Sequence, residues 1–402
     1  MKRRLVVVLA FFLFGLALLF FRLENGCSST VPHSRRTSNW PKLQSNISKR
    51  AANVTLATRR VKVFKNWTGR KRMEQCPPIY GKIGIFISHW KGNDTLSPIP
   101  LDSIRCYVKS TNYTLFEIDM NTDRETRRHC SQYKDIMFRR HCAVTLYAKK
   151  VDWLVVLDAD TAVVNPSHCI EEYIDPSVDI IFYERFHNFE IAAGNFLVRH
   201  SKFSQKFLLD WAGYFNERQT KEGEWFSNRD NGALLIHLAR NLRPEAEPEI
   251  DYCNEVWHNI EGLGEYFAYV TCVRWILGAQ RKFPGKIRIH RRADGIARDL
   301  WVNDPVFCEH DFMLHGFKDE KRGNPIFSEE FDVSKCGRNF NGWNWNRTFV
   351  VSCERVKEEL IRSEDFFRWV WFPNASRVDH FMNYQEMSRC WPNCDKRRGK
   401  RI

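Results

Sequence analysis

The chain has 402 residues, of which 43% are hydrophobic, and its 62 Lys and Arg against 48 Asp and Glu give a formal net charge of +14. This composition is that of a folded protein with a large core and excludes an intrinsically disordered chain. The excess charge lies at the two ends: residues 1–75 hold 16 Lys and Arg against 2 Asp and Glu, and residues 395–402 hold 5 against 1. The residues between carry a net charge of −4. Nucleic-acid binding is therefore the least favoured function class.

An unbroken apolar run occupies residues 5–21, between three basic residues and Arg22. As a helix this run would span about 26 Å, close to the roughly 27 Å hydrocarbon thickness of an early secretory membrane. It ends in Leu and Phe instead of the small residues that precede a signal-peptidase site, so we predict a transmembrane signal anchor. The positive charges before the run favour a cytosolic tail at residues 1–4. The remainder would be lumenal, as in a single-pass type II protein of the Golgi or ER membrane.

Residues 22–78 are polar and basic, which predicts a flexible stem. Seven Asn-x-Ser/Thr sequons agree with a lumenal location. They lie at Asn46, Asn53, Asn66, Asn93, Asn112, Asn346 and Asn374. The 13 cysteines lack zinc-finger spacing, so we expect disulfide bonds. The odd count leaves Cys27 as our choice for a free thiol or an intermolecular disulfide in a dimer, and the pairing of the other twelve stays open.

From about residue 79 the sequence alternates between strand-like and helical patterns. Short apolar runs predict strands at residues 83–87, 115–118, 153–157, 178–183 and 195–198. Helical spacing predicts a helix over residues 135–150, and Ser201 is a candidate N-cap for another. This alternation predicts an α/β fold with ligands at the carboxyl ends of its strands. We expect that domain over residues 79–325 and a Cys- and Trp-rich accessory segment over residues 326–402.

The pair Asp158 and Asp160 directly follows the apolar run at residues 153–157. A carboxylate at the end of a buried strand is costly unless another charge offsets it. Two carboxylates at this spacing can meet one Mg²⁺ or Mn²⁺ ion, which takes oxygen ligands and keeps coordination positions open for a phosphate. A solvated turn is the alternative interpretation of such an acidic pair.

The stretch WLVVLDADTAVVNP resembles the metal-binding DxD motif and strand of GT-A-type glycosyltransferases, whose domain is Rossmann-like. The blocks EIAAGNFLVRHSKFSQKFLLDW, RDNGALLIHL and DFMLHGFK follow it in the order seen in the galactosyl-, mannosyl- and xylosyltransferase family. The chain also resembles a nematode-expanded family of predicted nucleotide-diphospho-sugar transferases. The resemblance covers roughly residues 81–318.

This resemblance implies roles for individual residues. Asp158 would contact both the ribose-diphosphate and the metal, and Asp160 and His315 would complete the metal ligands. Lys318 would hold the diphosphate. An imidazole ligand suits Mn²⁺ better than Mg²⁺, so Mn²⁺ is the expected cofactor.

Four further positions are assigned to the substrate. Gly194 and Asn195 would let the donor sugar approach the backbone. Asp230 and Asn231 would bind sugar hydroxyls and serve catalysis, although a helix N-cap is an alternative for this pair.

Other candidates surround these positions. Arg140, with its neighbours Arg139 and His141, would reach the diphosphate or lie on an exposed basic helix face. Residues 83–90 should lie under the nucleotide base. Two acidic residues, Glu184 and Glu190, are candidates near the acceptor.

The implied activity is divalent-metal-dependent transfer of a sugar, a hexose by expectation, from a nucleotide-sugar donor to a hydroxyl of a glycan or glycoprotein, with retention of configuration by analogy. One alternative is a non-catalytic lumenal glycan-binding or scaffold protein on the same fold. Another is a metal phosphohydrolase, although such enzymes draw several Asp and His ligands from separate strands.

Overall fold

The computed structural model describes residues 76–90, 98–186, 188–216, 229–300, 304–317, 326–327, 332–337, 341–370 and 387–395. The predicted cytosolic tail, the signal anchor, almost all of the stem, Cys27 and Lys318 lie outside these residues. Within the described part of the chain, no helix is both long enough and apolar enough to cross a membrane.

A seven-stranded sheet forms the centre of the described residues, with the strand order β2-β1-β3-β6-β5-β8-β7. Its strands are β1 (Ile83–His89), β2 (Thr114–Asp119), β3 (Trp153–Leu157), β5 (Ile180–Tyr183), β6 (Phe196–Val198), β7 (Lys282–Phe283) and β8 (Ile287–His290). The first three are parallel to one another, whereas β6 is antiparallel to both β3 and β5. The prediction of an α/β fold is therefore confirmed, with a sheet of mixed strand direction.

A smaller sheet of three strands continues from the end of β3. It has the order β4-β10-β9, with β4 (Thr161–Val163), β10 (Met313–His315) and β9 (Ala297–Asp299). In β10, His315 pairs with Thr161 on one side and with Asp299 on the other. This register brings a residue from late in the chain beside the acidic pair that follows β3.

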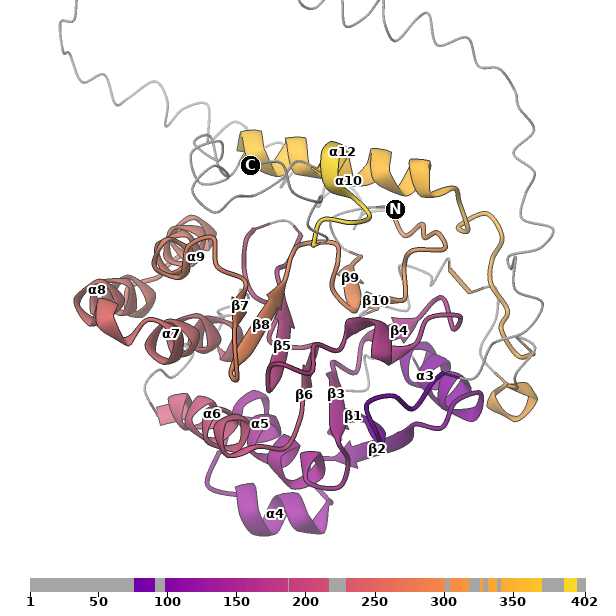
Figure 1. Ribbon diagram of the computed structural model, residues 1–402, viewed down its shortest axis with the longest axis horizontal. Helices are drawn as coiled ribbons and strands as arrows, with labels where there is room; N and C mark the ends of the chain where they lie inside the picture. The colour runs from indigo at the N-terminus through magenta and orange to yellow at the C-terminus, as the bar shows by residue number, and fades with distance from the viewer. Residues whose placement is uncertain are drawn as a thin grey trace, which may run out of the picture. The chain divides into compact units, whose positions relative to one another are not determined.

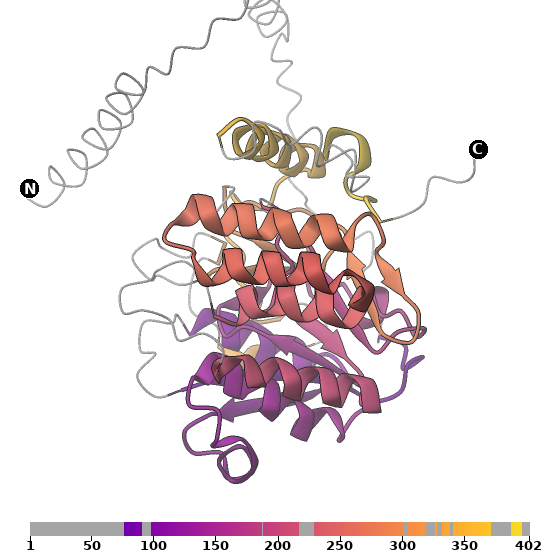
Figure 2. The ribbon, with the colours of Figure 1, turned by 90° about the vertical axis from the view of Figure 1, so that its left-hand side faces the viewer.

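Helices cover both faces of the large sheet (Figures 1 and 2). One face packs against α5 (Ile136–Ala148), α6 (Lys202–Gly213), α7 (Asp230–Leu242), α8 (Glu247–His258) and α9 (Leu263–Leu277). The other face packs against α3 (Ile99–Lys109) and the small sheet. The other α-helices of the described residues are α4 (Arg124–Cys130), α10 (Cys353–Val370) and α12 (Met387–Cys390). Short 3₁₀ helices include Ile170–Tyr173, Tyr214–Asn216, Pro244–Ala246 and Val333–Lys335.

The apolar side chains of β3 explain why this strand is central. Leu154 and Val156 face the cluster of α5 to α9, while Trp153, Val155 and Leu157 face the other cluster. Alternate side chains of a strand point to opposite faces, so an unbroken apolar run is needed where both faces are covered.

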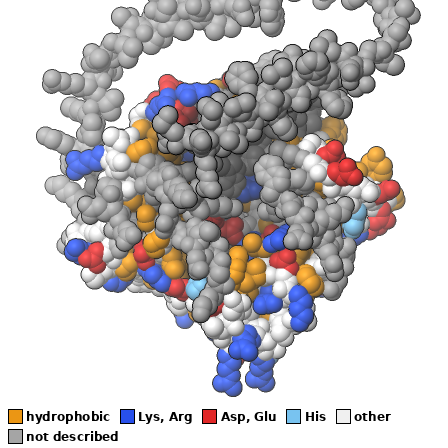
Figure 3. Space-filling view, turned by 180° about the vertical axis from the view of Figure 1, so that it is seen from behind, with side chains coloured by type: hydrophobic (Ala, Val, Ile, Leu, Met, Phe, Trp, Pro, Cys, Tyr) orange, Lys and Arg blue, Asp and Glu red, His pale blue; other side chains and the backbone are white. Residues whose placement is uncertain are grey.

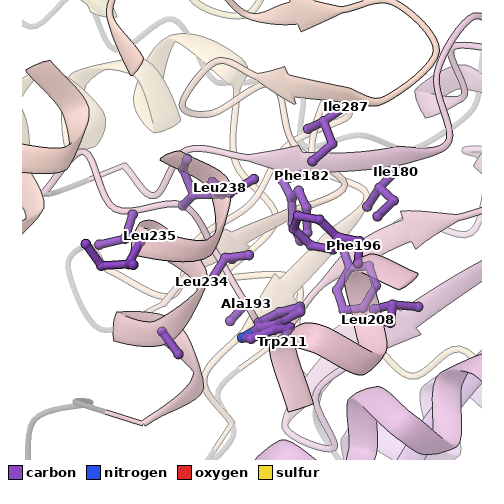
Figure 4. Packing of buried hydrophobic residues seen from close by; sticks show 14 of the residues in the cluster. Ile180, Phe182, Ala193, Phe196, Leu208, Trp211, Leu234, Leu235, Leu238 and Ile287 are labelled. Atoms are coloured by element: carbon purple, nitrogen blue, oxygen red, sulfur yellow. The ribbon is translucent and has the colours of Figure 1, made fainter. Parts of the chain in front are cut away.

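Aromatic side chains fill the space between the sheet and α6 (Figure 4). Phe182 of β5 meets Trp211 of α6 edge-on, with ring centroids 6.1 Å apart, and Phe196 of β6 lies 5.9 Å from the same indole. The predicted N-cap of this helix is confirmed, because the Ser201 side chain accepts a hydrogen bond from the backbone N–H of Ser204.

Every cysteine of the described residues is paired in a disulfide bond. The pairs are Cys76–Cys169, Cys106–Cys336, Cys130–Cys142, Cys253–Cys272, Cys308–Cys353 and Cys390–Cys394. They use all the cysteines except Cys27, in agreement with the expected disulfides. Two of the pairs, at Cys336 and Cys353, connect the predicted accessory segment to residues before position 326.

The described surface carries charges of both signs (Figure 3). Lys and Arg side chains gather at the lower end of this face, where Figure 1 places α4. That helix has three exposed arginines, Arg124, Arg127 and Arg128.

Candidate functional site

The carboxyl end of β3 brings together two carboxylates and an imidazole. Asp158 and Asp160 leave the sheet at this end, and His315 arrives as the last residue of β10. His315 Nε2 lies 3.2 Å from Asp158 Oδ2 and 3.2 Å from Asp160 Oδ1. One potential ligand atom from each of the three residues lies within 4.8 Å of the other two. The structure therefore joins the three residues that the sequence resemblance assigned to one metal ion.

These three side chains are a chemically suitable donor set for one divalent cation. Carboxylate oxygens and an imidazole nitrogen together suit Mn²⁺ well. Asp160 and His315 are buried, whereas the Asp158 side chain is 25% exposed. Asp158 is thus the ligand candidate that a substrate can also reach.

Asp299 lies directly behind His315. Its Oδ1 atom is 2.9 Å from His315 Nδ1, on the side of the ring that faces away from Asp158 and Asp160. The contact follows from the parallel pairing of β9 with β10, which sets the two residues opposite each other. Metal-binding histidines commonly donate their second ring N–H to a carboxylate in this manner.

The charged groups of this cluster shift one another's pKa values. Burial alone would raise the pKa of Asp158, but Arg140 and then His315 hold that pKa well below its usual value. Burial opposes a charge on His315, yet the surrounding carboxylates, Asp160 first, outweigh burial and keep the pKa of the imidazole well above its usual value. In the absence of a metal the imidazolium supplies the positive charge that these carboxylates require. A cation bound there would replace that proton.

Arg140 connects Asp158 to Asp230 across α5 and α7. Its guanidinium donates to Asp158 and, from Nη2, to Asp230 Oδ2 at 2.5 Å. His141 Nε2 lies 3.2 Å from the same Asp230 oxygen, and burial lowers the pKa of His141 to about 4. The neutral His141 ring also stacks on Trp211, with centroids 3.5 Å apart.

This arrangement corrects two alternatives raised by the sequence. Arg140 and His141 are buried, so they do not lie on an exposed basic helix face. Their neighbour Arg139 donates to backbone carbonyls of the preceding turn. Asp230 is the first residue of α7, and the cap position is Arg229. The carboxylate of Asp230 therefore serves the Arg140 ion pair instead of an N-cap.

Gly194 and Asn195 lie against the backbone and side chain of Asp158. A Cβ atom on residue 194 would lie 1.8 Å from Asp158 Oδ2, so only glycine leaves room for that carboxylate. Asn195 is fully buried, and its Oδ1 accepts from Asp158 N–H and from the Thr161 hydroxyl, both at 3.0 Å. Its Nδ2 donates to the Tyr183 hydroxyl at 3.2 Å. These contacts of Asn195 hold the loop that contains Asp158 and Asp160 in place. Its contact with a donor sugar stays a prediction.

Asn231 and Glu184, two further candidates from the sequence, both have polar partners in the structure. Asn231 Oδ1 accepts from Ala193 N–H at 3.0 Å, which joins α7 to the loop before Gly194. Glu184 pairs with Arg274 and Arg281, the latter at 2.9 Å.

Glu190 pairs with Arg185 at 2.8 Å and accepts from the Tyr266 hydroxyl. Both glutamates are thus engaged in buried ion pairs. In β1, Ile87 is level with Leu157, so His89 lies at the same sheet edge as Asp158.

A family model described as "Protein of unknown function, DUF273" matches residues 104–330, more than half of the chain. The chain belongs to the DUF273 family. The matched part of this DUF273 protein contains all of the described site, from Arg140 on α5 to His315 on β10.

No curated protein matches the chain. Among solved structures, the chain is similar to a glycosyltransferase involved in the glycosylation of the major capsid of PBCV-1, at 13% identity and a TM-score of 0.32, over 58% of this chain and 93% of that one. It is also similar to the apo-form glycosyltransferase GlyE of Streptococcus pneumoniae TIGR4, at 13% identity and a TM-score of 0.27, over 39% of this chain and 43% of that one.

The sequence did not indicate Asp299 or Arg185 as site residues. Neither residue belongs to a motif at a fixed spacing from the acidic pair. Only the pairing of β9 with β10 brings Asp299 to His315.

Proposed function

We propose that this DUF273 protein is a divalent-metal-dependent glycosyltransferase that moves a sugar from a nucleotide-sugar donor to a hydroxyl of a glycan or glycoprotein. The observation that supports the proposal most is the convergence of Asp158, Asp160 and His315 at the carboxyl end of β3. In α/β sheets, ligands bind at this edge.

Asp160 and His315 would hold the cation, with Asp158 as the ligand shared between the cation and the substrate. When bound, Mn²⁺ or Mg²⁺ would supply Lewis-acid stabilisation of the departing diphosphate. Arg140 would keep Asp158 ionised and oriented, since its guanidinium donates to that carboxylate. Lys318 would add positive charge for the diphosphate.

The sugar would lie between Asp158 and the start of α7. Arg140 pairs with both Asp158 and Asp230 and so fixes their relative positions. Asn231 holds the loop before Gly194 through its hydrogen bond with Ala193 N–H. Such prepositioned polar groups give a rate gain by orienting the reacting hydroxyl and the anomeric carbon. We include retention of configuration in the proposal, on the basis of the family resemblance alone.

The described residues favour a single-ion transferase site over a two-metal phosphohydrolase. Two other groups of ligand-type residues have the necessary proximity, namely Cys76–Cys169–Glu171 and Glu309–His310–Cys353. All of their cysteines are in disulfide bonds and are not available as thiolate ligands. Two-metal hydrolases place a second ion about 3.5–4 Å from the first, which needs additional ligands.

A donor panel tests the proposal. Full-length protein is incubated with Mn²⁺ and each common nucleotide sugar, and release of the nucleoside diphosphate is measured. We expect turnover of at least one donor, loss of turnover in Asp160→Ala, and retention in Asp179→Asn. Asp179 is a suitable control because it is also buried and ion-paired, with Arg199, but it precedes β5 instead of following a strand. Equal turnover by Asp160→Ala and wild type would refute the metal assignment.

We further propose that the enzyme is a type II membrane protein with its catalytic domain in the Golgi or ER lumen. The support is the apolar run at residues 5–21 and the observed disulfides, which need an oxidising compartment. When intact vesicles are treated with a protease, the membrane should shield the catalytic domain. Digestion of that domain without detergent would contradict this orientation.

A further inference from the structure

A chain of buried polar groups extends from His315 away from the three candidate metal ligands. His315 Nδ1 faces Asp299 Oδ1 at 2.9 Å, and Arg185 Nε lies 3.5 Å from Asp299 Oδ2. Arg185 Nη1 then donates to Glu190 Oε2 at 2.8 Å. The Asp299 side chain is 1% exposed, so water does not compete for these contacts.

For the neutral form of His315, which is the form that binds a metal, this geometry decides which ring nitrogen carries the proton. An ionised carboxylate only accepts hydrogen bonds, so Nδ1 must be the donor to Asp299. The neutral ring then has its lone pair on Nε2, the atom that faces Asp158 and Asp160. Only a nitrogen with a lone pair binds a metal.

Arg185 matters because its positive charge faces Asp299 Oδ2 from 3.5 Å, as an ion pair and not as a hydrogen bond. A group at position 299 must therefore present an oxygen to Arg185 and, with its other atom, accept a hydrogen bond from His315. A carboxylate meets this requirement, whereas a carboxamide has one accepting and one donating end.

We propose that Asp299 is a positioning residue for the metal centre: it fixes the tautomer and ring plane of His315 so that Nε2 is presented to the cation, and Arg185 holds Asp299 in that role. The inference rests on the proposed metal site and adds to it a residue that does not contact the cation.

The test is the affinity of the full-length protein for Mn²⁺ alone, measured by titration calorimetry, in wild type, Asp299→Asn and Asp311→Asn. In Asp299→Asn the amide oxygen faces Arg185 and the amide N–H₂ faces His315, which forces the proton onto Nε2. We expect Mn²⁺ affinity to fall about 10- to 100-fold, the usual effect of losing such a partner. Asp311 is a matched control, because it is also buried and accepts from an arginine, Arg298 at 2.7 Å. Asp311→Asn should bind Mn²⁺ as wild type does.

The outcomes separate this inference from the proposed function. If wild type binds no Mn²⁺, or if Asp160→Ala binds it equally well, the metal site itself is wrong. If wild type binds Mn²⁺ through Asp160 but Asp299→Asn retains full affinity, only the role of Asp299 is overturned.

A second measurement, made on the wild type, does not require the Asp299→Asn variant to fold. Selective ¹⁵N labelling of histidine, with saturating Mg²⁺ as a diamagnetic ion and His315→Gln for assignment, reports the protonation of each ring nitrogen. We expect a proton on Nδ1 and none on Nε2. A proton on Nε2 in the presence of bound metal would overturn the inference.

Discussion

Gly194 lies so close to Asp158 that a methyl group on residue 194 would meet the carboxylate, with a Cβ–Oδ2 distance of 1.8 Å. The carboxylate of Asp158 in turn accepts from Arg140 and approaches His315. The glycine therefore determines where the most exposed of the candidate ligands lies.

The first prediction concerns this glycine. Gly194→Ala should push the Asp158 carboxylate out of its position and abolish most of the sugar transfer. Overpacking of this kind should also destabilise the fold by about 1–3 kcal/mol. Denaturant unfolding and the donor assay measure the two effects. Gly213→Ala, on α6, should leave both unchanged or slightly raise stability, because no atom beyond its chain neighbours and its own helix backbone lies within 4 Å of the added Cβ. Full activity of Gly194→Ala would show that Asp158 does not need its observed position.

The second prediction concerns the arginine that joins two carboxylates. Arg140→Lys keeps the charge but has a single donating group, so it cannot reach Asp158 and Asp230 as the guanidinium does. We expect a loss of stability of about 3 kcal/mol, since one buried carboxylate loses its partner. We also expect the folded variant to lose most of its transferase activity. Arg139→Lys is the control, because the neighbouring Arg139 binds only carbonyl oxygens. If Arg140→Lys and Arg139→Lys behave alike, the bridge has no special role.

The third prediction concerns acid sensitivity. Burial lowers the pKa of His237 to about 4, below the unfolded value of about 6.5, and its Nε2 donates to the Phe207 carbonyl at 2.9 Å. The unfolded chain therefore takes up a proton at this residue before the folded chain does. Above about pH 6.5 the histidine has no effect, and stability falls as the pH drops towards 4, by about 2–3 kcal/mol at pH 4.5.

Urea unfolding of the metal-free protein at pH 7.5 and 4.5 measures that loss. His237→Gln should lose less stability between the two pH values than wild type does. His141 has a similarly lowered pKa of about 4 and contributes a further part that the variant retains. An unchanged pH dependence in His237→Gln would contradict the assignment.

The fourth prediction concerns the odd cysteine. Twelve of the 13 cysteines form disulfide bonds, which leaves Cys27 as the single thiol that can pair between chains. Full-length protein should migrate as a dimer on a non-reducing gel and as a monomer after reduction. Cys27→Ser should be a monomer in both conditions, and a persistent covalent dimer would show that another cysteine exchanges partners.

Five of the seven strands of the large sheet, all except β7 and β8, could be predicted because each depends on local sequence. The run Trp153–Leu157 is apolar on both faces, and the structure buries every residue of it. Ser201 caps its helix through its own side chain, a signal confined to a few residues. The reversed direction of β6 between β3 and β5 was not predictable, because it depends on the path of the connections and not on any residue pattern.

Site residues that belong to a sequence motif were predictable, whereas a residue that reaches the site only through strand pairing was not. Asp158 and Asp160 lie two residues apart at a strand end, so their proximity follows from the sequence. His315 was assigned through the resemblance of its block, and the structure brings it to the pair. Asp299 depends on the register of β9 with β10, for which no local signal exists.

The proposed metal site is tested most directly by the position of a bound Mn²⁺ ion, determined from its anomalous scattering in crystals soaked with Mn²⁺ and a nucleoside diphosphate. We expect one peak within coordination distance of Asp160 and His315 Nε2, with the diphosphate on its open side next to Asp158. An Mn²⁺ peak elsewhere, or a diphosphate bound without any ion between these three residues, would contradict the proposed site.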